Sequence, residues 1–214
     1  MALANYTDLQ ASVASWLHRS DLTTQIVDFI TMAESRLNRQ LRLRAMEADE
    51  TLTTVIDSRS CALPDRFVEP IECEIMLPNG NTWDPLYKSI PEEMSVTTVS
   101  GRPCYWTIDG ETVAFERPLD QAYNMRLRCF IGFDLASTTT NWLMTNHPDL
   151  YLYGTLLEAP IYLRDESRLA LWQERFDRAL DQVMTKDRRS RRRPLNTEVG
   201  LYHNSRRTTQ RLFL

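Results

Sequence analysis

The chain has 214 residues and is 43% hydrophobic, enough to bury one sizeable core or two small ones. Its 25 basic and 29 acidic residues give a net charge of −4, which argues against a dedicated nucleic-acid binder because an acidic protein repels phosphate. No segment is apolar for about 18 residues, and the first ten residues lack a basic region followed by an apolar run, so we expect neither a membrane span nor an export signal.

The charge is distributed unevenly along the chain. Residues 1–187 contain 17 basic and 28 acidic residues, a net of −11, whereas residues 188–214 contain 8 and 1, a net of +7. We call residues 188–214 the arm. Of the 25 cations 23 are arginine, whose forked guanidinium binds carboxylate as readily as phosphate. The arm's charge therefore indicates an anionic partner but does not choose between nucleic acid and protein.

The apolar spacing near the N-terminus predicts two helices. In YTDLQASVASWLHR the apolar residues fall on one helical stripe, and Thr7 and Gln10 have the spacing of a capping box. After a cap signal at Ser20-Asp21, apolar residues repeat at three and four through a second helix. The two stripes consist of Leu9, Val13, Trp16 and Leu17, and of Ile26, Phe29, Ile30, Ala33, Leu37 and Leu41.

Between about Met46 and Phe133 the apolar period changes to two, which is typical of strands. Alternation is clearest in residues 71–77 and 123–131. Asn79-Gly80 and Asp109-Gly110 favour tight hairpin turns because these residues tolerate positive φ. The middle of the chain is therefore predicted to form a small antiparallel sheet or barrel.

Helical spacing returns after His147. The segment PDLYLYGTLLEAPIYL is apolar on most faces, so it is expected to be buried, with a kink or break near Glu158 caused by Pro160. A last, amphipathic helix is predicted to end near Asp187, with a buried stripe of Leu169, Trp172, Phe176, Leu180 and Val183. The arm beyond it offers no core, so we expect it to be disordered until a partner binds it.

The sequence shows no recognisable catalytic motif. There is no phosphate loop, dinucleotide fingerprint or nucleophile elbow. The spacing of His18, His147 and His203 gives no metal cluster. Four cysteines lie far apart without a CxxC pair, which indicates reduced structural thiols. We therefore expect no enzyme, no metal and no cofactor.

Four segments in order carry a family resemblance. They are YTDLQASVASWLHRSDLTTQIVDFITMAESRLNRQLRLRAME, LPDRF, GRPCYWTIDGETVAFERP and NWLMTNHPDLYLYGTLLEAPIYLRDESRLALWQERFDRAL. Their order and spacing resemble the head-to-tail adaptor (connector) family of tailed bacteriophages, especially the short-tailed kind, over most of residues 5–185.

The resemblance implies an α+β fold. Both chain ends, residues 1–45 and 140–187, would form a four-helix bundle domain. Residues 46–139 would form a β-rich inserted domain, and residues 188–214 a basic, extended C-terminal arm.

The resemblance also implies a structural role in the virion neck, after assembly in the host cytoplasm. Such a protein forms a homo-oligomeric ring, usually twelvefold, under the portal protein, and genomic DNA passes transiently through its bore. Tail nozzle and tail-fibre proteins would bind on the other side. Two alternatives stay open: a nucleic-acid-binding protein that uses the arginine-rich arm, and an enzyme whose site has no familiar motif.

Within this interpretation the arm anchors the protein to the portal, and the hairpin tips face the tail. Arginines would pair with portal carboxylates, and apolar side chains would insert into portal clefts. The expected portal-binding residues are Arg188, Arg189, Arg191, Arg192, Arg193, Leu195, Leu201, Tyr202, Arg206, Arg207, Arg211, Leu212 and Phe213. The expected tail-side residues are Asn79, Gly80, Asp109 and Gly110.

Overall fold

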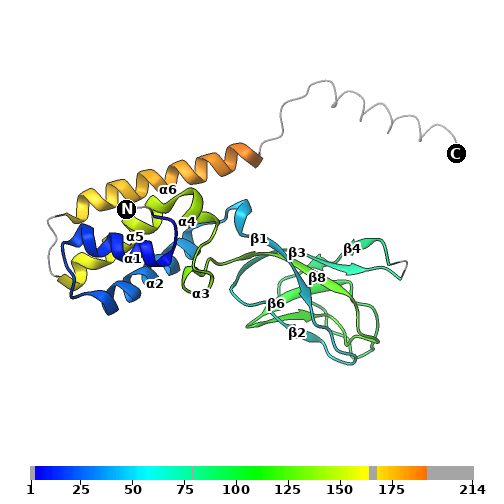
Figure 1. The fold of residues 1–214 in the computed structure, drawn as a ribbon. Coiled ribbons are helices and arrows are strands. Elements are labelled where there is room, and N and C mark those ends of the chain that lie inside the picture. Colours follow the sequence, from blue (N-terminus) through cyan, green and yellow to red (C-terminus); the bar gives the residue numbers. More distant parts are fainter. Residues whose placement is uncertain (1–2, 79, 164–167, 192–214) are drawn as a thin grey trace, which may run out of the picture.

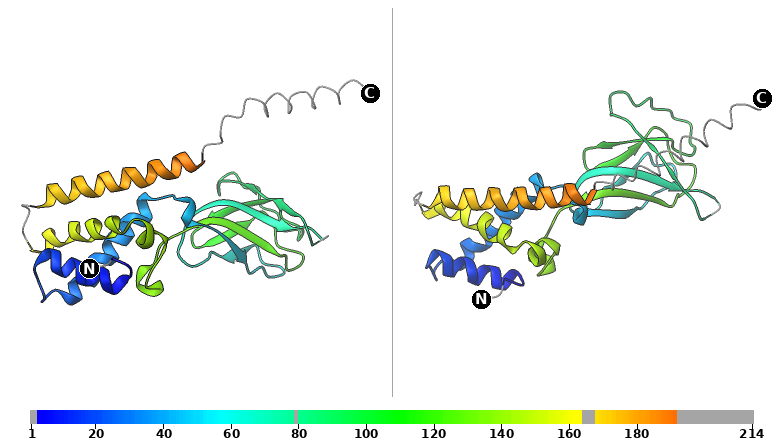
Figure 2. Two further views of the ribbon diagram at one scale, coloured as in Figure 1. Left: turned by 45° about the horizontal axis from the view of Figure 1, so that its top comes forward. Right: turned by 90° about the horizontal axis from the view of Figure 1, so that it is seen from above.

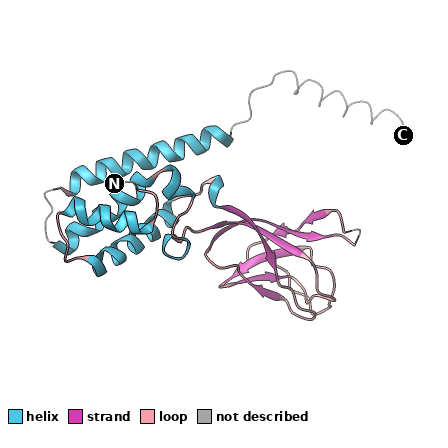
Figure 3. Cartoon of the chain, viewed as in Figure 1, coloured by secondary structure: helices cyan, strands magenta, loops and turns pink. Residues whose placement is uncertain are grey.

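A computed structural model describes residues 3–78, 80–163 and 168–191. Helices from both ends of the chain lie together at one end of the molecule, and the strands between them form the other end (Figures 1 and 3). We call these the helical part and the β part. The mixed α+β class predicted from the sequence is confirmed.

The helical part is organised around its most apolar helix, α5. This helix contacts α1, α2, α4 and α6, and the predicted stripe of α2 is buried in the same core. The helices are α1 Tyr6–Leu17, α2 Thr23–Gln40, α3 Leu135–Thr138, α4 Trp142–Asn146, α5 Pro148–Leu163 and α6 Leu169–Arg191, with a 3-10 turn, η1, at Arg44–Met46.

The start of α1 differs from the prediction. The N-cap is Asn5, whose side-chain oxygen accepts a hydrogen bond from Asp8 N at 2.9 Å. The capping box expected at Thr7 and Gln10 is therefore wrong, because Thr7 already lies in the first turn. Trp16, a member of the predicted apolar stripe, is 46% exposed at the end of the helix.

The two C-terminal helices are longer than the sequence indicated. Pro160 does not end α5, which continues to Leu163. The last helix, α6, continues through Arg191 instead of ending near Asp187, and an ion pair of 2.6 Å joins these two residues one turn apart. The first four residues of the predicted extended arm are therefore helical.

The β part contains two four-stranded sheets among the described residues. One has the order β1-β8-β3-β4 and the other β2-β7-β6-β5. Every pair is antiparallel except β5 with β6, which is parallel, so the predicted antiparallel pairing holds for all described pairs but that one. The strands are β1 Glu47–Leu52, β2 Ser60–Ala62, β3 Phe67–Met76, β4 Trp83–Pro85, β5 Tyr87–Lys88, β6 Tyr105–Asp109, β7 Thr112–Phe115 and β8 Met125–Ile131.

The two sheets share one apolar core. Trp106 and Phe115 of one sheet and Leu127 of the other are almost fully buried in a single cluster. Residues of β8 alternate between this core and the outside as far as Cys129, as a sandwich requires. Cys61 and Cys73 are buried in the same cluster, and burial raises the pKa of these thiols to about 11 and about 12, which fits structural thiols.

Two polar side chains of α2 hold the chain where it returns from the β part to the helices. The side-chain amide of Asn38 donates to Phe133 O at 2.9 Å and accepts from Phe133 N at 2.8 Å. The Glu34 carboxylate accepts from Leu135 N at 2.9 Å and from the Tyr151 hydroxyl at 2.6 Å. Burial raises the pKa of Glu34. We call these two residues the α2 junction.

The close approach at the α2 junction also explains Gly132. A Cβ atom there would lie 3.1 Å from the Asn38 side-chain nitrogen, closer than an ordinary contact. The glycine thus lets the returning chain pass close enough for Phe133 to pair with Asn38.

Replacing Asn38 with alanine should lower the free energy of unfolding by about 1–3 kcal/mol, because both polar groups of Phe133 lose their partners. Urea unfolding measures this change. Asn124, whose side chain is exposed, provides the control, and Asn124→Ala should change stability by less than about 0.5 kcal/mol. Equal effects of the two substitutions would show that the Asn38 contacts contribute nothing.

Candidate functional site

The described arginines of the predicted arm form a basic end on α6. Arg188, Arg189 and Arg191 are exposed in the last turns, where positive charge is favourable beside the negative end of the helix dipole. The other predicted portal-binding residues lie outside the described residues. They are Arg192, Arg193, Leu195, Leu201, Tyr202, Arg206, Arg207, Arg211, Leu212 and Phe213.

Arg191 ties the end of α6 to the chain that leads into the β part. Its Nη2 donates to Arg42 O at 2.8 Å and lies 3.5 Å from Glu47 Oε1. Its Nε lies 2.6 Å from Asp187 Oδ2. Asp187 also accepts a hydrogen bond from Arg44 N at 3.0 Å. We call these contacts the α6 latch.

The α6 latch also reaches the first sheet. Glu47 is the first residue of β1, and its Oε2 accepts from Arg128 Nη2 of β8 at 2.9 Å. In Figures 1 and 2 the end of α6 lies close to η1 and the start of β1. The sequence analysis missed the α6 latch. Its only local signal is the i,i+4 spacing of Asp187 and Arg191.

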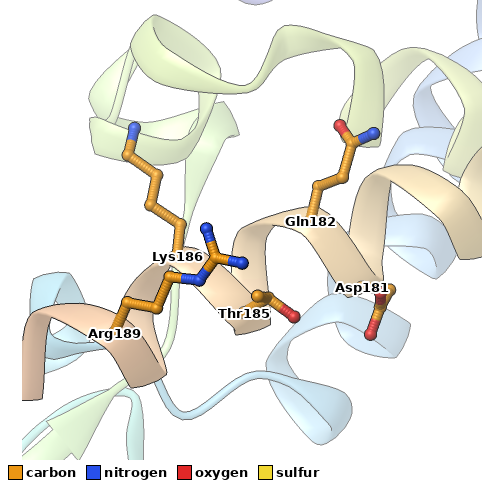
Figure 4. Close-up of a pocket in the computed structure, with 5 residues that line it drawn as sticks. All are labelled: Asp181, Gln182, Thr185, Lys186 and Arg189. Carbon is orange, nitrogen blue, oxygen red and sulfur yellow. The ribbon is translucent and has the colours of Figure 1, made fainter. Parts of the chain in front are cut away.

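Two cavities flank the basic end of α6. One, of about 300 Å³, has only α6 residues among its described lining, and Figure 4 shows the Lys186 and Arg189 side chains projecting from the helix there. The other, of about 500 Å³, lies between α6, η1 and α4. Lys186 lines both, and Trp142 lines the second. Cations beside an apolar ring suit an anionic group, such as a protein carboxylate or a phosphate.

The predicted hairpin turns are both present. Gly110 and Glu111 connect β6 to β7, and Gly110 has φ of +57°, which glycine adopts without strain. Gly80 has φ of +69° in the turn between β3 and β4. Asn79 lies outside the described residues.

The two turns lie at opposite ends of the β part, so they do not form one surface. Leu63 N donates to Glu111 O at 3.1 Å, which places the β6–β7 turn beside the chain leading into β3, on the side of the helices. Met76 N donates to Asn124 O at 2.8 Å, which places the β3–β4 turn beside the start of β8. We call the end of the β part that contains the β3–β4 turn, away from the helices, the distal end.

The distal end carries exposed aliphatic side chains. Val55 and Ile56 are each 56% exposed just after β1, and Val99 is 68% exposed. The Ser100 hydroxyl lies 3.5 Å from the Asp57 carboxylate, which brings the two loops together. The sequence analysis did not single out these residues, because neither loop has an apolar period.

In residues 3–78, 80–163 and 168–191, no group of three His, Cys, Asp or Glu side chains could hold a metal ion. His147 Nε2 is buried without a hydrogen-bond partner, and burial lowers the pKa of this imidazole. Its ring lies 5.6 Å from that of Trp142, so packing explains its position.

Comparison with protein families gives a match over most of the chain. The family model described as SU10 adaptor protein matches residues 4–198. No curated protein matches the chain. Over the ranges that the structure describes, no helix is both long and apolar enough to cross a membrane.

Removal of the Arg191 side chain should loosen the α6 latch. Arg191→Ala should speed hydrogen exchange of the amides in residues 42–47 about threefold to tenfold, because one charge-assisted contact to each side of η1 is lost. Arg188→Ala is the control, because Arg188 is exposed in the same helical turn and makes none of the contacts of the α6 latch. Mass spectrometry of exchanged peptides measures the difference, and unchanged exchange in Arg191→Ala would contradict the α6 latch.

Proposed function

We propose, from the premise that this chain belongs to the SU10 adaptor protein family, that it joins the portal of a phage head to the tail. The match to residues 4–198 carries this proposal, since it covers both the helical part and the β part. Membership in this family of head-to-tail adaptors makes the chain a phage structural protein of the virion neck. A structural adaptor implies a non-enzymatic role.

The finer proposal is a ring of identical subunits, twelvefold, that sits under the portal and lines the path of the genome. In this proposal the four long helices, α1, α2, α5 and α6, make up the bundle domain of each subunit. The net charge of −11 over residues 1–187 supports a conduit, because a negative wall repels phosphate and lets DNA slide. Assembly takes place in the host cytoplasm.

The arm, in this proposal, anchors the ring to the portal. The exposed Arg188 and Arg189 present cations where the helix ends, and the α6 latch fixes the position from which the rest of the arm departs. Arginine pairs with carboxylates in a fork, and the apolar residues of the arm add burial of about 1.5–3 kcal/mol for each full-sized side chain. Pure phosphate binding would gain nothing from those apolar residues.

A nucleic-acid-binding role of the arm is the second candidate. Lys186, Arg188 and Arg189 gather on the last two turns of α6, and such a cluster gains free energy by releasing counterions from phosphate. Binding of this kind would weaken steeply with salt and would not depend on apolar residues.

Substitutions in the arm distinguish these two roles. Leu212→Ser with Phe213→Ser should weaken capture of the purified portal at least tenfold, because two buried apolar side chains are lost while every arginine is kept. Truncation after Pro194 should abolish capture. Leu171→Ser, at an exposed residue near the start of α6, is the control and should leave capture unchanged.

The readouts are portal capture at two salt concentrations and the mass of the complex, which should equal a ring of subunits on one portal. The nucleic-acid role would be favoured if the double serine variant captured the portal fully and if only the removal of arginines reduced capture, with a matching loss of DNA binding.

The distal end is proposed to contact tail nozzle and tail-fibre proteins. Exposed aliphatic side chains presented by loops on a rigid sandwich are suited to a protein partner. Because the Asp109-Gly110 turn lies at the other end of the β part, the tail contact is assigned to the Asn79-Gly80 end.

Changing Val55 and Ile56 together to serine should leave portal capture intact and reduce tail attachment at least tenfold. Asp109→Ala with Glu111→Ala, at the opposite turn, is the control and should attach tails normally. Electron micrographs of assembled particles count attached tails. A loss of portal capture in the Val55/Ile56 variant, with normal tails in particles that form, would show that the protein is oriented the other way.

A further inference from the structure

Two strand edges of the β part border an open groove. β1 ends the first sheet and β2 ends the second, since among the described strands β1 pairs only with β8 and β2 only with β7. A cavity of about 720 Å³ lies between them. We call this cavity the edge groove. It is lined by Glu50, Thr51, Thr53 and Val55 on one side and by residues 60–66 on the other.

An open edge of this kind is suited to an extended peptide. An edge strand presents unpaired backbone N–H and C=O groups that accept an added strand, and uncovered edges promote association between copies. β1 is six residues long, enough for several backbone hydrogen bonds. The described residues place no third strand beside it.

The side chains of the edge groove and of β1 define the chemistry of the occupant. Cys61 is buried and Leu63 half-buried, so they give an otherwise largely polar groove an apolar patch. Glu50 lines one wall, and Glu47 and Asp49 precede it on β1, so half of that strand is acidic. A segment that mixes arginines with apolar side chains would be complementary to both features.

Residues 192–214 of the same chain have this composition. They contain five arginines and one carboxylate, Glu198, together with apolar side chains such as Leu201, Tyr202 and Leu212. The segment also begins at the right place, because Arg191 lies 3.5 Å from Glu47 at the start of β1. Its 23 residues could span roughly 75 Å at about 3.3 Å each, far more than the length of β1.

We propose that the edge groove binds residues 192–214 of its own chain, added to β1 as an extended strand, when no portal is present. The bound segment covers the acidic edge and neutralises part of its charge. Portal binding and groove binding then compete for one segment, so an isolated subunit keeps both its edge and its arm protected. Binding of the segment to the edge groove does not depend on the adaptor role, whereas its competition with portal binding rests on the anchor proposed above.

Hydrogen exchange of the full-length protein tests the proposal. The amides of residues 48–52 that point away from β8 should exchange at least tenfold more slowly than in a variant that ends at Arg191. Circular dichroism and unchanged exchange in α5 establish that the truncated variant is folded. If it is not folded, the full-length variant Asp49→Asn with Glu50→Gln takes its place and should speed exchange of the same amides at least threefold.

The matched control is Glu92→Gln with Glu93→Gln, which removes two exposed carboxylates from a loop that does not line the edge groove. It should leave exchange in β1 unchanged. Equal exchange in full-length and folded truncated protein would overturn the proposal. Protection that grows with protein concentration would also overturn it, because the bound segment would then belong to another copy. Portal capture is measured separately, so failure of the anchor and failure of the edge groove give different results.

Discussion

The structure depends on two polar side chains of one helix, which bind the backbone of the chain where it returns from the last strand. Asn38 and Glu34 lie on α2, and together they bind the backbone of Phe133 and Leu135 where the chain re-enters the helical part. Backbone groups that leave a sheet lose their ladder partners and need new ones when they are partly buried. The α2 junction supplies these partners, and the Tyr151 hydroxyl from α5 completes it by donating to Glu34. The helical core and the β part are therefore joined by directional bonds as well as by apolar contact.

The α6 latch fixes the other chain segment that connects the helical part to the β part, the one that leads into β1. The α2 junction binds the chain after β8, and Arg191 and Asp187 bind it before β1. Between them, Glu47 and Arg128 join β1 to β8 across the outer face of the sheet. Apolar residues follow the same route, since Met46 and Phe130 are buried in the helical core. An adaptor of this shape can pass a load from one end to the other, because both connecting chains are fixed at several points.

Apolar periodicity predicted the elements well and their polar connections poorly. The stripe of α2 and the alternation of β8 are both buried as expected, because a repeated apolar pattern has few ways to escape water. Asn38 and Glu34 gave no such signal, since a polar residue on a helix looks the same whether it faces solvent or a distant backbone. The parallel pairing of Tyr87 with Tyr105 is equally non-local, because it depends on where an intervening loop returns. The basic end of α6 was found from charge alone, whereas its ion pair to Glu47 joins residues far apart in the sequence.

The pairing of Glu47 with Phe130 has a consequence for how this architecture changes over time. These residues are register partners in β1 and β8, so the chain leaves the helical part and comes back to it at neighbouring points about 5 Å apart. The residues between Glu47 and Phe130 can be lengthened, shortened or exchanged without changing the distance between the two points where the chain joins the helical part. Proteins tolerate insertions best where the two ends of the inserted piece lie close together. A lineage built on this plan can therefore exchange the β part while the helical core stays the same.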